Sequence, residues 1–292
     1  MPARRDTISF LSDYGTDDEL VGVVKSVIRS IAAHVTVIDL THGIPPHDVR
    51  AGGLALARAS QYLAPGVALA VVDPGVGTDR RAVAVEVAEG QAIFVGPDNG
   101  LLASAVTMVG GATRAVELTA THYHLPAPGP TFAGRDVFAP AAAHLCNGVE
   151  LAELGRPIDP AGLIPGVMPV PRLEEGRLVA EVLWVDRFGN LQLNVDPDEL
   201  AEPAGRIVLR LGDRVRTAVR AESYAAVATG ELGLVVDGYG LLSICLCRHS
   251  AAAELGLDVG DTVILGGDDQ GGSPVGGPEP VHLRPRRGRA GT

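Results

Sequence analysis

The sequence predicts an α/β domain, in which helices flank a mostly parallel sheet, followed by a smaller all-β, barrel-like domain. Short apolar runs alternate with helical stretches as far as about residue 165. Beyond a proline-rich stretch at 157–171, only short strand-like runs separated by turns remain. The length of 292 residues fits two domains, at roughly 150 residues per domain.

The first half of the chain carries the alternation of strands and helices. Residues 19–33 and 48–62 place apolar side chains at helical spacing, which predicts two amphipathic helices. Short β-rich runs that end at turn residues predict strands at 8–11, 35–40, 68–72, 82–87 and 92–95. Ligands of such sheets bind beyond the carboxyl ends of the strands. We therefore expect one shared site where loops follow strands, at 12–18, 41–48, 73–80 and 97–100.

The second half predicts a small β barrel or sandwich, because no long helix interrupts its short strands. These strands are expected at 177–185, 206–211, 215–219, 232–236, 241–246 and 262–265. The expected domains are then 1–165 and 172–265, joined by a linker at 166–171. Residues 266–292 are rich in glycine, proline and arginine, and we expect them to form a disordered tail.

Charge and composition narrow the class of partner. The chain has 24 Lys+Arg against 35 Asp+Glu, a net charge of −11, and no basic stretch before the tail, which argues against nucleic acid. No apolar run reaches the roughly 20 residues of a membrane span, and the start of the chain lacks a signal-peptide pattern. The 3 cysteines form no C-x-x-C pair. Together these features predict a cytoplasmic protein with no membrane partner.

The strongest local motif is VVDPGVGTDR, which runs from residue 71 to Arg80. A strand delivers Asp73 to its carboxyl end, and the proline and glycines that follow force a tight turn. Arg80 could then reach the carboxylate, keep it ionised and fix its orientation, which suits the positioning of a water molecule. The alternative interpretation is a structural salt bridge that closes the loop.

A second acidic residue follows the first predicted strand. Asp13 could accept hydrogen bonds from a ribose diol, as acidic residues do in dinucleotide sites. Asp17 and Asp18 fit caps of the next helix better.

A metal centre is an alternative for a third group of residues, Asp39, His42, His47 and Asp48, which lie close together in sequence. Their spacing matches no metal-binding signature, and no second group of ligands accompanies them. We therefore expect no metal site.

Six short motifs recur in an order that is typical of one family. They are SDYG at 12–15, DLTH at 39–42, VDPGVGT at 72–78, GPDNG at 96–100, GRDVF at 134–138 and DRFGN at 186–190. Over residues 7–265 the sequence resembles the S-adenosyl-L-methionine (SAM) hydroxide adenosyltransferases, the hydrolase branch of the family that contains the 5′-fluorinase and 5′-chlorinase. The resemblance implies hydrolysis of SAM to adenosine and L-methionine by SN2-type attack of water or hydroxide at the ribose 5′ carbon, with no metal or other cofactor.

The resemblance also implies roles for individual residues. Asp13 would hold the ribose hydroxyls and Asp186 would meet the methionine ammonium, while the remaining substrate-binding positions are Gly134, Phe188, Asn190 and Tyr224, the last three around the adenine. Members of the family are typically homotrimers, with each site between the α/β domain of one subunit and the β domain of its neighbour.

Two catalytic residues, Asp73 and Arg80, match members of the family's Asp–Arg–His set that handles water. Fluorinases carry tyrosine at the position of Asp73, threonine at that of Val76, and an insertion within 83–94. A carboxylate accepts a hydrogen bond from water but repels a halide. The sequence therefore favours hydrolysis, with a 5′-halogenase as the alternative.

One departure from the hydrolase pattern concerns the third member of that set. The family histidine is replaced by Ala133 here, and alanine neither accepts a proton nor donates a hydrogen bond. We expect substrate binding to be intact and turnover to be reduced, unless His122 or His124 takes over. A catalytically silent SAM- or adenosine-binding protein is the alternative of a different class.

Overall fold

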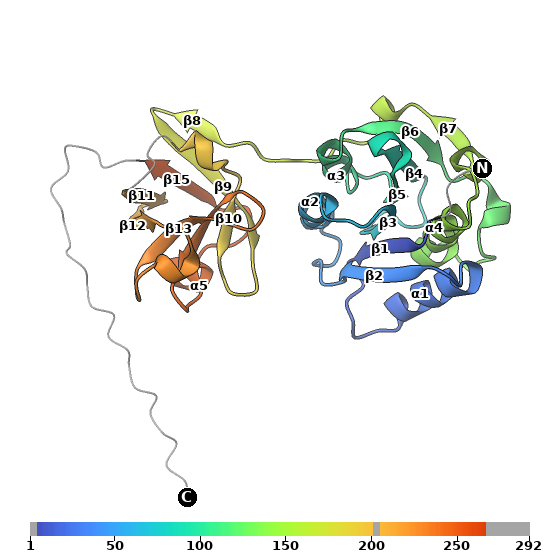
Figure 1. The fold of residues 1–292 in the computed structure, drawn as a ribbon, viewed down its shortest axis with the longest axis horizontal. Coiled ribbons are helices and arrows are strands. Elements are labelled where there is room, and N and C mark those ends of the chain that lie inside the picture. Colours follow the sequence, from blue (N-terminus) through green and yellow to red (C-terminus); the bar gives the residue numbers. More distant parts are fainter. Residues whose placement is uncertain (1–4, 201–204, 267–292) are drawn as a thin grey trace, which may run out of the picture. The chain divides into compact units, whose positions relative to one another are not determined.

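The computed structural model describes residues 5–200 and 205–266 (Figure 1). The chain divides into two compact units, Met1–Met168 and Pro169–Thr292, which are called unit 1 and unit 2 below. Of the tail expected at 266–292, Gly266 is the last residue of strand β15 (Thr262–Gly266), and residues 267–292 lie outside the described residues. Each unit builds its own hydrophobic core.

Unit 1 contains the predicted, mostly parallel sheet. Its strand order is β2-β1-β3-β5-β4-β6-β7. Strand β1 pairs in parallel with β2 and β3, and β3 pairs in parallel with β5, whereas β4 and β7 run antiparallel to their neighbours. The strand bounds are β1 Thr7–Ser12, β2 Thr36–Thr41, β3 Gly66–Val71, β4 Ala82–Val87, β5 Ala92–Pro97, β6 Ala112–Glu117 and β7 Arg156–Ile158.

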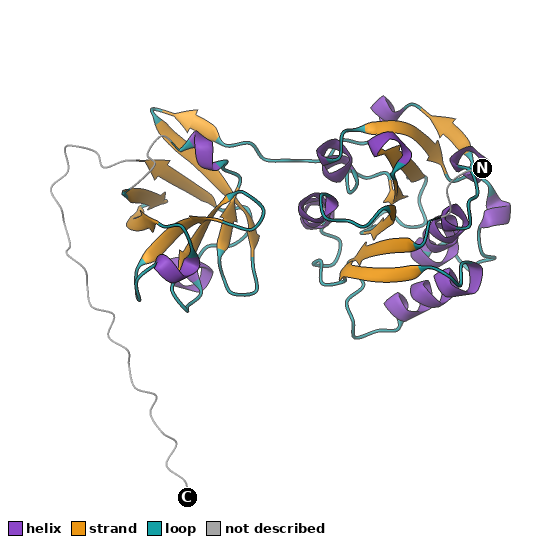
Figure 2. Cartoon of the chain, in the orientation of Figure 1, coloured by secondary structure: helices purple, strands orange, loops and turns teal. Residues whose placement is uncertain are grey.

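Helices cover both faces of this sheet, as predicted (Figure 2). Helices α1 (Leu20–Ile31) and α4 (Ala139–Cys146) pack into one core with Val67 and Leu69 of β3. Helices α2 (Val49–Ser60) and α3 (Ala103–Met108) pack into another with alternate residues of the same strand, such as Ala68. Strand β3 is buried along its whole length, which explains its unbroken apolar run.

Two details differ from the sequence-based expectations. Strands β4 and β5 form an antiparallel pair joined by a single 3-10 turn at Ala88–Gly90, so no α-helix crosses over between them. The prediction that Asp17 or Asp18 caps α1 is wrong, because the helix begins later and its N-cap, Glu19, makes no side-chain hydrogen bond. By contrast, the Asp48 carboxylate caps α2 by accepting a hydrogen bond from the Ala51 N–H.

Unit 2 is a closed β barrel, which confirms the barrel-like prediction (Figure 1). The strands follow the order β10-β14-β13-β12-β11-β15-β9, and the β10–β9 pairing closes the ring; β8 adds to β9 outside it. Alternate side chains, such as Leu191 and Leu193, fill the interior. The bounds are β8 Arg172–Glu174, β9 Arg177–Val185, β10 Leu191–Leu193, β11 Arg206–Leu211, β12 Arg214–Arg220, β13 Leu232–Val236, β14 Leu242–Leu246, β15 Thr262–Gly266 and helix α5 Ala251–Leu255.

Short helical turns connect the larger elements. They are η1 Ala88–Gly90, η2 Thr121–Tyr123, η3 Gly134–Phe138, η4 Leu151–Leu154, η5 Pro160–Gly162, η6 Pro197–Glu199 and η7 Tyr224–Ala226. Element η3 is a π-helical turn that runs directly into α4. Such turns occur frequently at functional sites.

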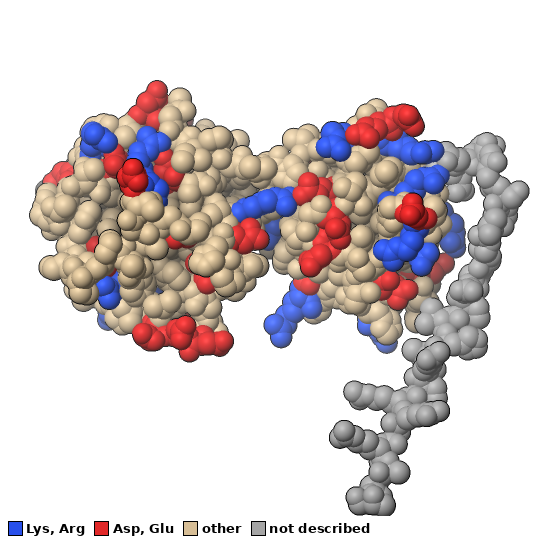
Figure 3. Space-filling view, turned by 180° about the vertical axis from the view of Figure 1, so that it is seen from behind, with Lys and Arg blue, Asp and Glu red and all other residues tan. Residues whose placement is uncertain are grey.

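The surface charge and the length of the helices can be compared with the partners that the sequence argued against, namely nucleic acid and the membrane. On the face drawn in Figure 3, arginine and lysine side chains are interspersed with acidic ones. Within 5–200 and 205–266, no helix is long and apolar enough to cross a membrane.

The cap of α2 provides a test of this description. Asp48→Ala removes the acceptor of the Ala51 N–H, and we expect it to lower the free energy of unfolding by about 1 kcal/mol. The matched control is Asp17→Ala, which removes an exposed carboxylate that caps nothing and should change stability by less than about 0.5 kcal/mol. Urea denaturation of both variants measures the difference. Equal effects of the two substitutions would contradict the assignment.

Candidate functional site

The polar loops of unit 1 leave the sheet at the carboxyl ends of its parallel strands. Strands β1 and β3 are parallel neighbours, and Ser12 at the end of β1 lies opposite Val71 at the end of β3. The Asp13 N–H donates to the Val71 carbonyl over 3.4 Å. The loops that carry Asp13 and Asp73 therefore begin side by side, at the carboxyl ends of their strands.

Asp73 and Arg80 form the ion pair that their spacing predicted. Arg80 Nε donates to Asp73 Oδ1 over 2.8 Å and Nη2 donates to Oδ2 over 2.5 Å. The Asp73 side chain is only 6% exposed, so the pair is shielded from bulk water. The guanidinium also lies over the Phe138 ring, 5.2 Å from its centroid. This two-point contact fixes the plane of the carboxylate, whose oxygens keep further lone pairs for a ligand.

Asp13 holds the neighbouring loop. Its Oδ2 atom accepts a hydrogen bond from the backbone N–H of His47 over 2.9 Å. His47 has a φ of +69°, a left-handed conformation that is unusual for a residue other than glycine. The Gly15 N–H donates to the His42 carbonyl over 2.8 Å, which ties the same two loops a second time. One carboxylate oxygen of Asp13, Oδ2, therefore has a structural role in joining the two loops.

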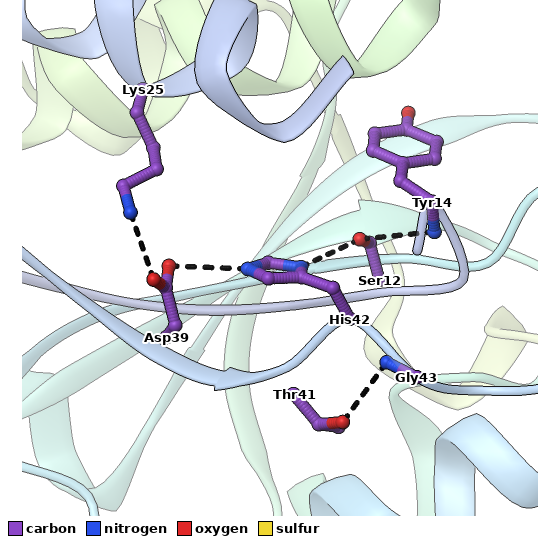
Figure 4. Close-up of polar contacts among 7 residues, drawn as sticks. All are labelled: Ser12, Tyr14, Lys25, Asp39, Thr41, His42 and Gly43. Atoms are coloured by element: carbon purple, nitrogen blue, oxygen red, sulfur yellow. Dashed lines mark hydrogen bonds and ion pairs between the residues drawn. The ribbon is translucent and has the colours of Figure 1, made fainter. Parts of the chain in front are cut away.

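A chain of hydrogen bonds joins the loop after β1 to β2 and α1, buried at Ser12 and His42 and exposed at its Lys25–Asp39 end (Figure 4). Ser12 Oγ contacts His42 Nδ1 at 2.8 Å, and His42 Nε2 contacts Asp39 Oδ1 at 3.1 Å. Lys25 Nζ of α1 donates to Asp39 Oδ2 over 2.8 Å. The backbone N–H of Tyr14 donates to Ser12 Oγ over 3.3 Å and completes the chain.

The chemistry of the four groups fixes the direction of each bond. A carboxylate only accepts, so His42 Nε2 carries the proton and donates to Asp39. In the neutral imidazole, Nδ1 then accepts from the Ser12 hydroxyl. Burial opposes ionisation of Asp39, but hydrogen bonds from Lys25 and His42 outweigh it and lower the pKa of this carboxyl. Because Ser12 is completely buried, the chain orients the turn at residues 13–15 and does not present a nucleophile.

Gly134 lies against the ring of Tyr14. A Cβ at position 134 would sit 2.2 Å from the Tyr14 hydroxyl oxygen, so only glycine leaves room for that phenol. The Tyr14 ring also meets Phe132 edge to face, with centroids 5.7 Å apart. Burial, and then the negative charges of Asp13 and Asp73, raise the pKa of Tyr14, so the hydroxyl stays protonated. No role was predicted for Tyr14 from the sequence, because only the folded chain brings it to Gly134.

The family's histidine position is occupied by Ala133, which packs against the core. The two histidines considered as substitutes lie in and beside η2, where the His122 ring contacts Tyr123 with centroids 4.2 Å apart. Burial, and then the neighbouring His122, lower the pKa of His124. The structure describes no hydrogen bond or ion pair between either histidine and Asp73 or Arg80, so it gives no support to a substitution by them.

In unit 2, Asp186 organises the loop between β9 and β10. Its Oδ1 atom accepts from the backbone N–H groups of Phe188 and Asn190, each over 2.8 Å, and Oδ2 accepts from Asn190 Nδ2 over 2.7 Å. Gly189 has a φ of +82° and packs directly on Ser250, so a side chain there would clash. The loop turns the Phe188 ring outward, where it is 77% exposed.

A small pocket of about 140 Å³ opens beside this loop. Three of the four predicted residues of unit 2 line it, namely Asp186, Asn190 and Tyr224, whereas Phe188 does not. Sequence reasoning missed the other lining residues, which are Trp184, Gln192, Asp237, Gly238, Tyr239 and Ser243. The sequence showed no strand pattern around Gln192, because β10 is only 3 residues long.

Two other candidate sites have less support from the structure. A cavity of about 320 Å³ in unit 1 is lined mainly by β4, β5, α3 and residues 160–165. Pro97, Asp98 and Gly100 of the predicted loop at 97–100 line it, whereas Asp13, Asp73 and Arg80 do not. The four residues considered as an alternative metal centre do not converge, because Asp48 caps α2 while Asp39 and His42 bind each other. In the described part of the chain, no group of three or more His, Cys, Asp or Glu is arranged to hold a metal ion.

The fold and the two polar sites define a two-domain protein that joins an α/β unit to a β barrel. Residues 8–155 match the SAM hydroxide adenosyltransferase N-terminal domain, and residues 180–264 match the C-terminal domain of the same family. The chain belongs to the SAM hydroxide adenosyltransferase family, which confirms the resemblance found in the motifs.

Individual relatives place the chain within that family. It is 44% identical over 254 residues, 87% of this chain and 95% of the relative, to a protein of Salinispora tropica named (R)-S-adenosyl-L-methionine hydrolase. A fluorinase of Actinopolyspora mzabensis is 31% identical over 69% of this chain and 75% of its own length. A solved structure of an uncharacterized conserved protein from Thermotoga maritima has a TM-score of 0.82 and 34% identity, covering 88% of this chain and 99% of that one.

The hydrogen-bond chain through Ser12 gives a testable expectation. Ser12→Ala leaves the Tyr14 N–H and His42 Nδ1 without their partner, and we expect a loss of about 1–3 kcal/mol in the free energy of unfolding. The matched control is Ser26→Ala, which removes an exposed hydroxyl of α1 that bonds only the Gly22 carbonyl. Chemical denaturation of both variants measures the effect, and a Ser12 variant as stable as the control would refute a structural role for the chain.

Proposed function

We propose that this protein hydrolyses SAM to adenosine and L-methionine. The observation that carries the proposal is the buried, two-point Asp73–Arg80 pair, which lies at the same sheet edge as Asp13. A fixed carboxylate beside a ribose-binding carboxylate suits a water molecule aimed at the 5′ carbon. The similarity to a named hydrolase is also higher than that to a fluorinase.

The reaction is a displacement at carbon. Asp73 accepts a hydrogen bond from the attacking water, and Arg80 keeps the carboxylate in place. The new bond joins the water oxygen to the 5′ carbon as the carbon–sulfur bond breaks, and the electron pair of that bond goes to the methionine sulfur. One water proton is released to solvent. Because the sulfonium leaves readily, the protein's tasks are alignment and the exclusion of bulk water.

The remaining residues bind the substrate in this proposal. Asp13 Oδ1 meets the ribose hydroxyls, Asp186 attracts the methionine ammonium, and the adenine is held by Phe188, Asn190 and Tyr224. Asp13 belongs to unit 1 and the other four residues belong to unit 2. We place each complete site between neighbouring subunits of a homotrimer. The pocket of unit 2 is too small for a whole SAM molecule, which supports a shared site.

We further propose that the reaction needs no metal or other cofactor and that the protein is cytoplasmic. Alignment of water and departure of a sulfonium need neither a Lewis acid nor a redox group. The free cysteines Cys146, Cys245 and Cys247 support a reducing compartment.

Product analysis tests the function. The purified protein is incubated separately with the (R) and (S) sulfonium epimers of SAM, and the products are separated by chromatography. We expect adenosine and L-methionine, formed faster from the (R) epimer that the relative's name specifies. Asp73→Ala should abolish turnover but retain SAM binding in calorimetry. A parallel incubation with chloride or fluoride that yields 5′-halo-adenosine would establish the halogenase alternative instead.

A catalytically silent binding protein is the second candidate, and Ala133 is the observation that favours it. Calorimetric binding of SAM with no adenosine after hours of incubation would establish that function. We instead propose that turnover is reduced but present, because the Tyr14 hydroxyl lies beside Gly134 and can donate to the water in place of the missing histidine.

Ala133 and Tyr14 are tested together. Ala133→His should raise kcat, because it restores a group that can accept the water proton. Tyr14→Phe should lower kcat roughly tenfold, the equivalent of one hydrogen bond of about 1.4 kcal/mol, and the gain from Ala133→His should be larger in that background. Tyr62→Phe, at the opposite edge of the sheet after α2, is the control. An unchanged rate in Ala133→His would show that the family histidine position does not limit turnover.

A further inference from the structure

The π-helical turn η3 contains a second shielded ion pair, between Arg135 and Asp136 of the GRDVF motif. Arg135 Nε donates to Asp136 Oδ1 over 2.6 Å, and Nη2 donates to Oδ2 over 3.0 Å. The Asp136 side chain is only 7% exposed. Adjacent residues of a helix do not normally face each other, so this two-point contact requires the long arginine side chain to fold back along the turn. The proposed hydrolysis assigns no role to either residue.

Arg135 connects this ion pair to the Tyr14 ring. Its guanidinium lies over the Phe132 ring, 5.0 Å from the centroid, which is a cation–π contact. Phe132 in turn meets Tyr14 edge to face, with the ring planes at 81° to each other. The Phe132 carbonyl also accepts hydrogen bonds from the N–H groups of Arg135 and Asp136, each over 3.0 Å. A continuous stack therefore runs from the Asp136 carboxylate, through Arg135 and Phe132, to the phenol.

Both ends of η3 lie against the site of unit 1. At its first residue, Gly134, the missing side chain leaves room for the Tyr14 hydroxyl. At its last residue, Phe138, the ring lies under the Arg80 guanidinium that holds Asp73. A shift of this one turn would therefore move the phenol relative to the Asp73 carboxylate.

Electrostatics connect Asp136 to the same phenol. Burial raises the pKa of Tyr14 most, and three carboxylates, among them Asp136, raise it further. The opposing charge of Arg80 offsets only part of this effect. The phenol therefore stays protonated at neutral pH and can donate a hydrogen bond. The Asp136 carboxylate lies close enough to act on Tyr14, and Arg135 fixes the place of that carboxylate.

We propose that Arg135 and Asp136 are positioning residues for the reaction. Their ion pair holds the Phe132 ring against Tyr14, and this contact aims the Tyr14 hydroxyl at the water bound by Asp73. The inference rests on the proposed function for the identity of the reaction. The pair acts through Tyr14 and not through contact with the substrate. A donor that is already held in place needs no reorganisation in the transition state, which is the gain that the stack supplies.

Steady-state kinetics with SAM test the proposal. Arg135→Lys keeps the charge but loses the planar two-point contact, and Phe132→Leu removes the ring. Each should lower kcat roughly threefold to tenfold and change KM by less than about twofold, because binding of the ground state is not affected. Phe132→Tyr, which keeps an aromatic ring, should retain more of the rate than Phe132→Leu. The matched control is Arg114→Lys, which breaks the exposed two-point pair of Arg114 with Glu86 and should leave kcat unchanged.

The Tyr14→Phe background separates positioning from a general effect on the fold. If Arg135 acts through the Tyr14 hydroxyl, Arg135→Lys should cost almost nothing further once that hydroxyl is gone. Losses that multiply in the double variant would overturn the proposal. An unchanged kcat in both Arg135→Lys and Phe132→Leu would overturn it as well.

A readout that needs no turnover distinguishes this inference from the proposed function. Fluorine NMR of protein labelled with 3-fluorotyrosine reports on the Tyr14 ring, whose signal among the 5 tyrosines is identified by its loss in Tyr14→Phe. Arg135→Lys should shift or broaden that signal, and Arg114→Lys should not. A shifted signal in a protein that does not hydrolyse SAM would refute the proposed function and confirm the hold on the Tyr14 ring. An unshifted signal would overturn the positioning role.

Discussion

The ion pair between Asp73 and Arg80 is the interaction on which the site of unit 1 depends. It closes the turn that follows β3, and it places the guanidinium over Phe138 in the π-helical turn η3. The same turn begins at Gly134, whose missing side chain accommodates the Tyr14 phenol from the loop after β1. One shielded pair therefore couples three segments that are distant in sequence, and a change in any of them would shift the carboxylate that is proposed to hold water.

Several acidic residues hold the backbone of their loops in addition to carrying negative charge. Asp13 supports a left-handed His47, while Asp186 and Asp237 each close a loop through two backbone N–H groups. In every case the carboxylate shapes the backbone with some of its lone pairs, and Asp186 and Asp237 also contribute negative charge to the pocket of unit 2. This arrangement suits a cationic substrate with a diol, because charge and geometry come from the same residue.

The sequence predicted the elements whose patterns are local. Buried strands such as β3 and the amphipathic α1 appear as apolar runs of characteristic period, and Asp73 and Arg80 were recognised because a seven-residue turn joins them. Strand β10 was not predicted, because a run of three residues is too short to show an alternating pattern. The cap of α1 was assigned to the wrong residues, because several acidic residues precede the helix. The contacts of Tyr14 with Gly134 and of Gln192 with Asp237 join distant segments, so no local signal could reveal them.

Isotope labelling tests most directly whether the water positioned by Asp73 attacks the 5′ carbon. SAM is hydrolysed in water enriched in oxygen-18, and both products are analysed by mass spectrometry. Displacement at the ribose predicts the label in the 5′ hydroxyl of adenosine and none in L-methionine, with label incorporation lost in Asp73→Ala. Label in homoserine alongside methylthioadenosine, or incorporation into adenosine that persists at the same rate without the Asp73 carboxylate, would contradict the account.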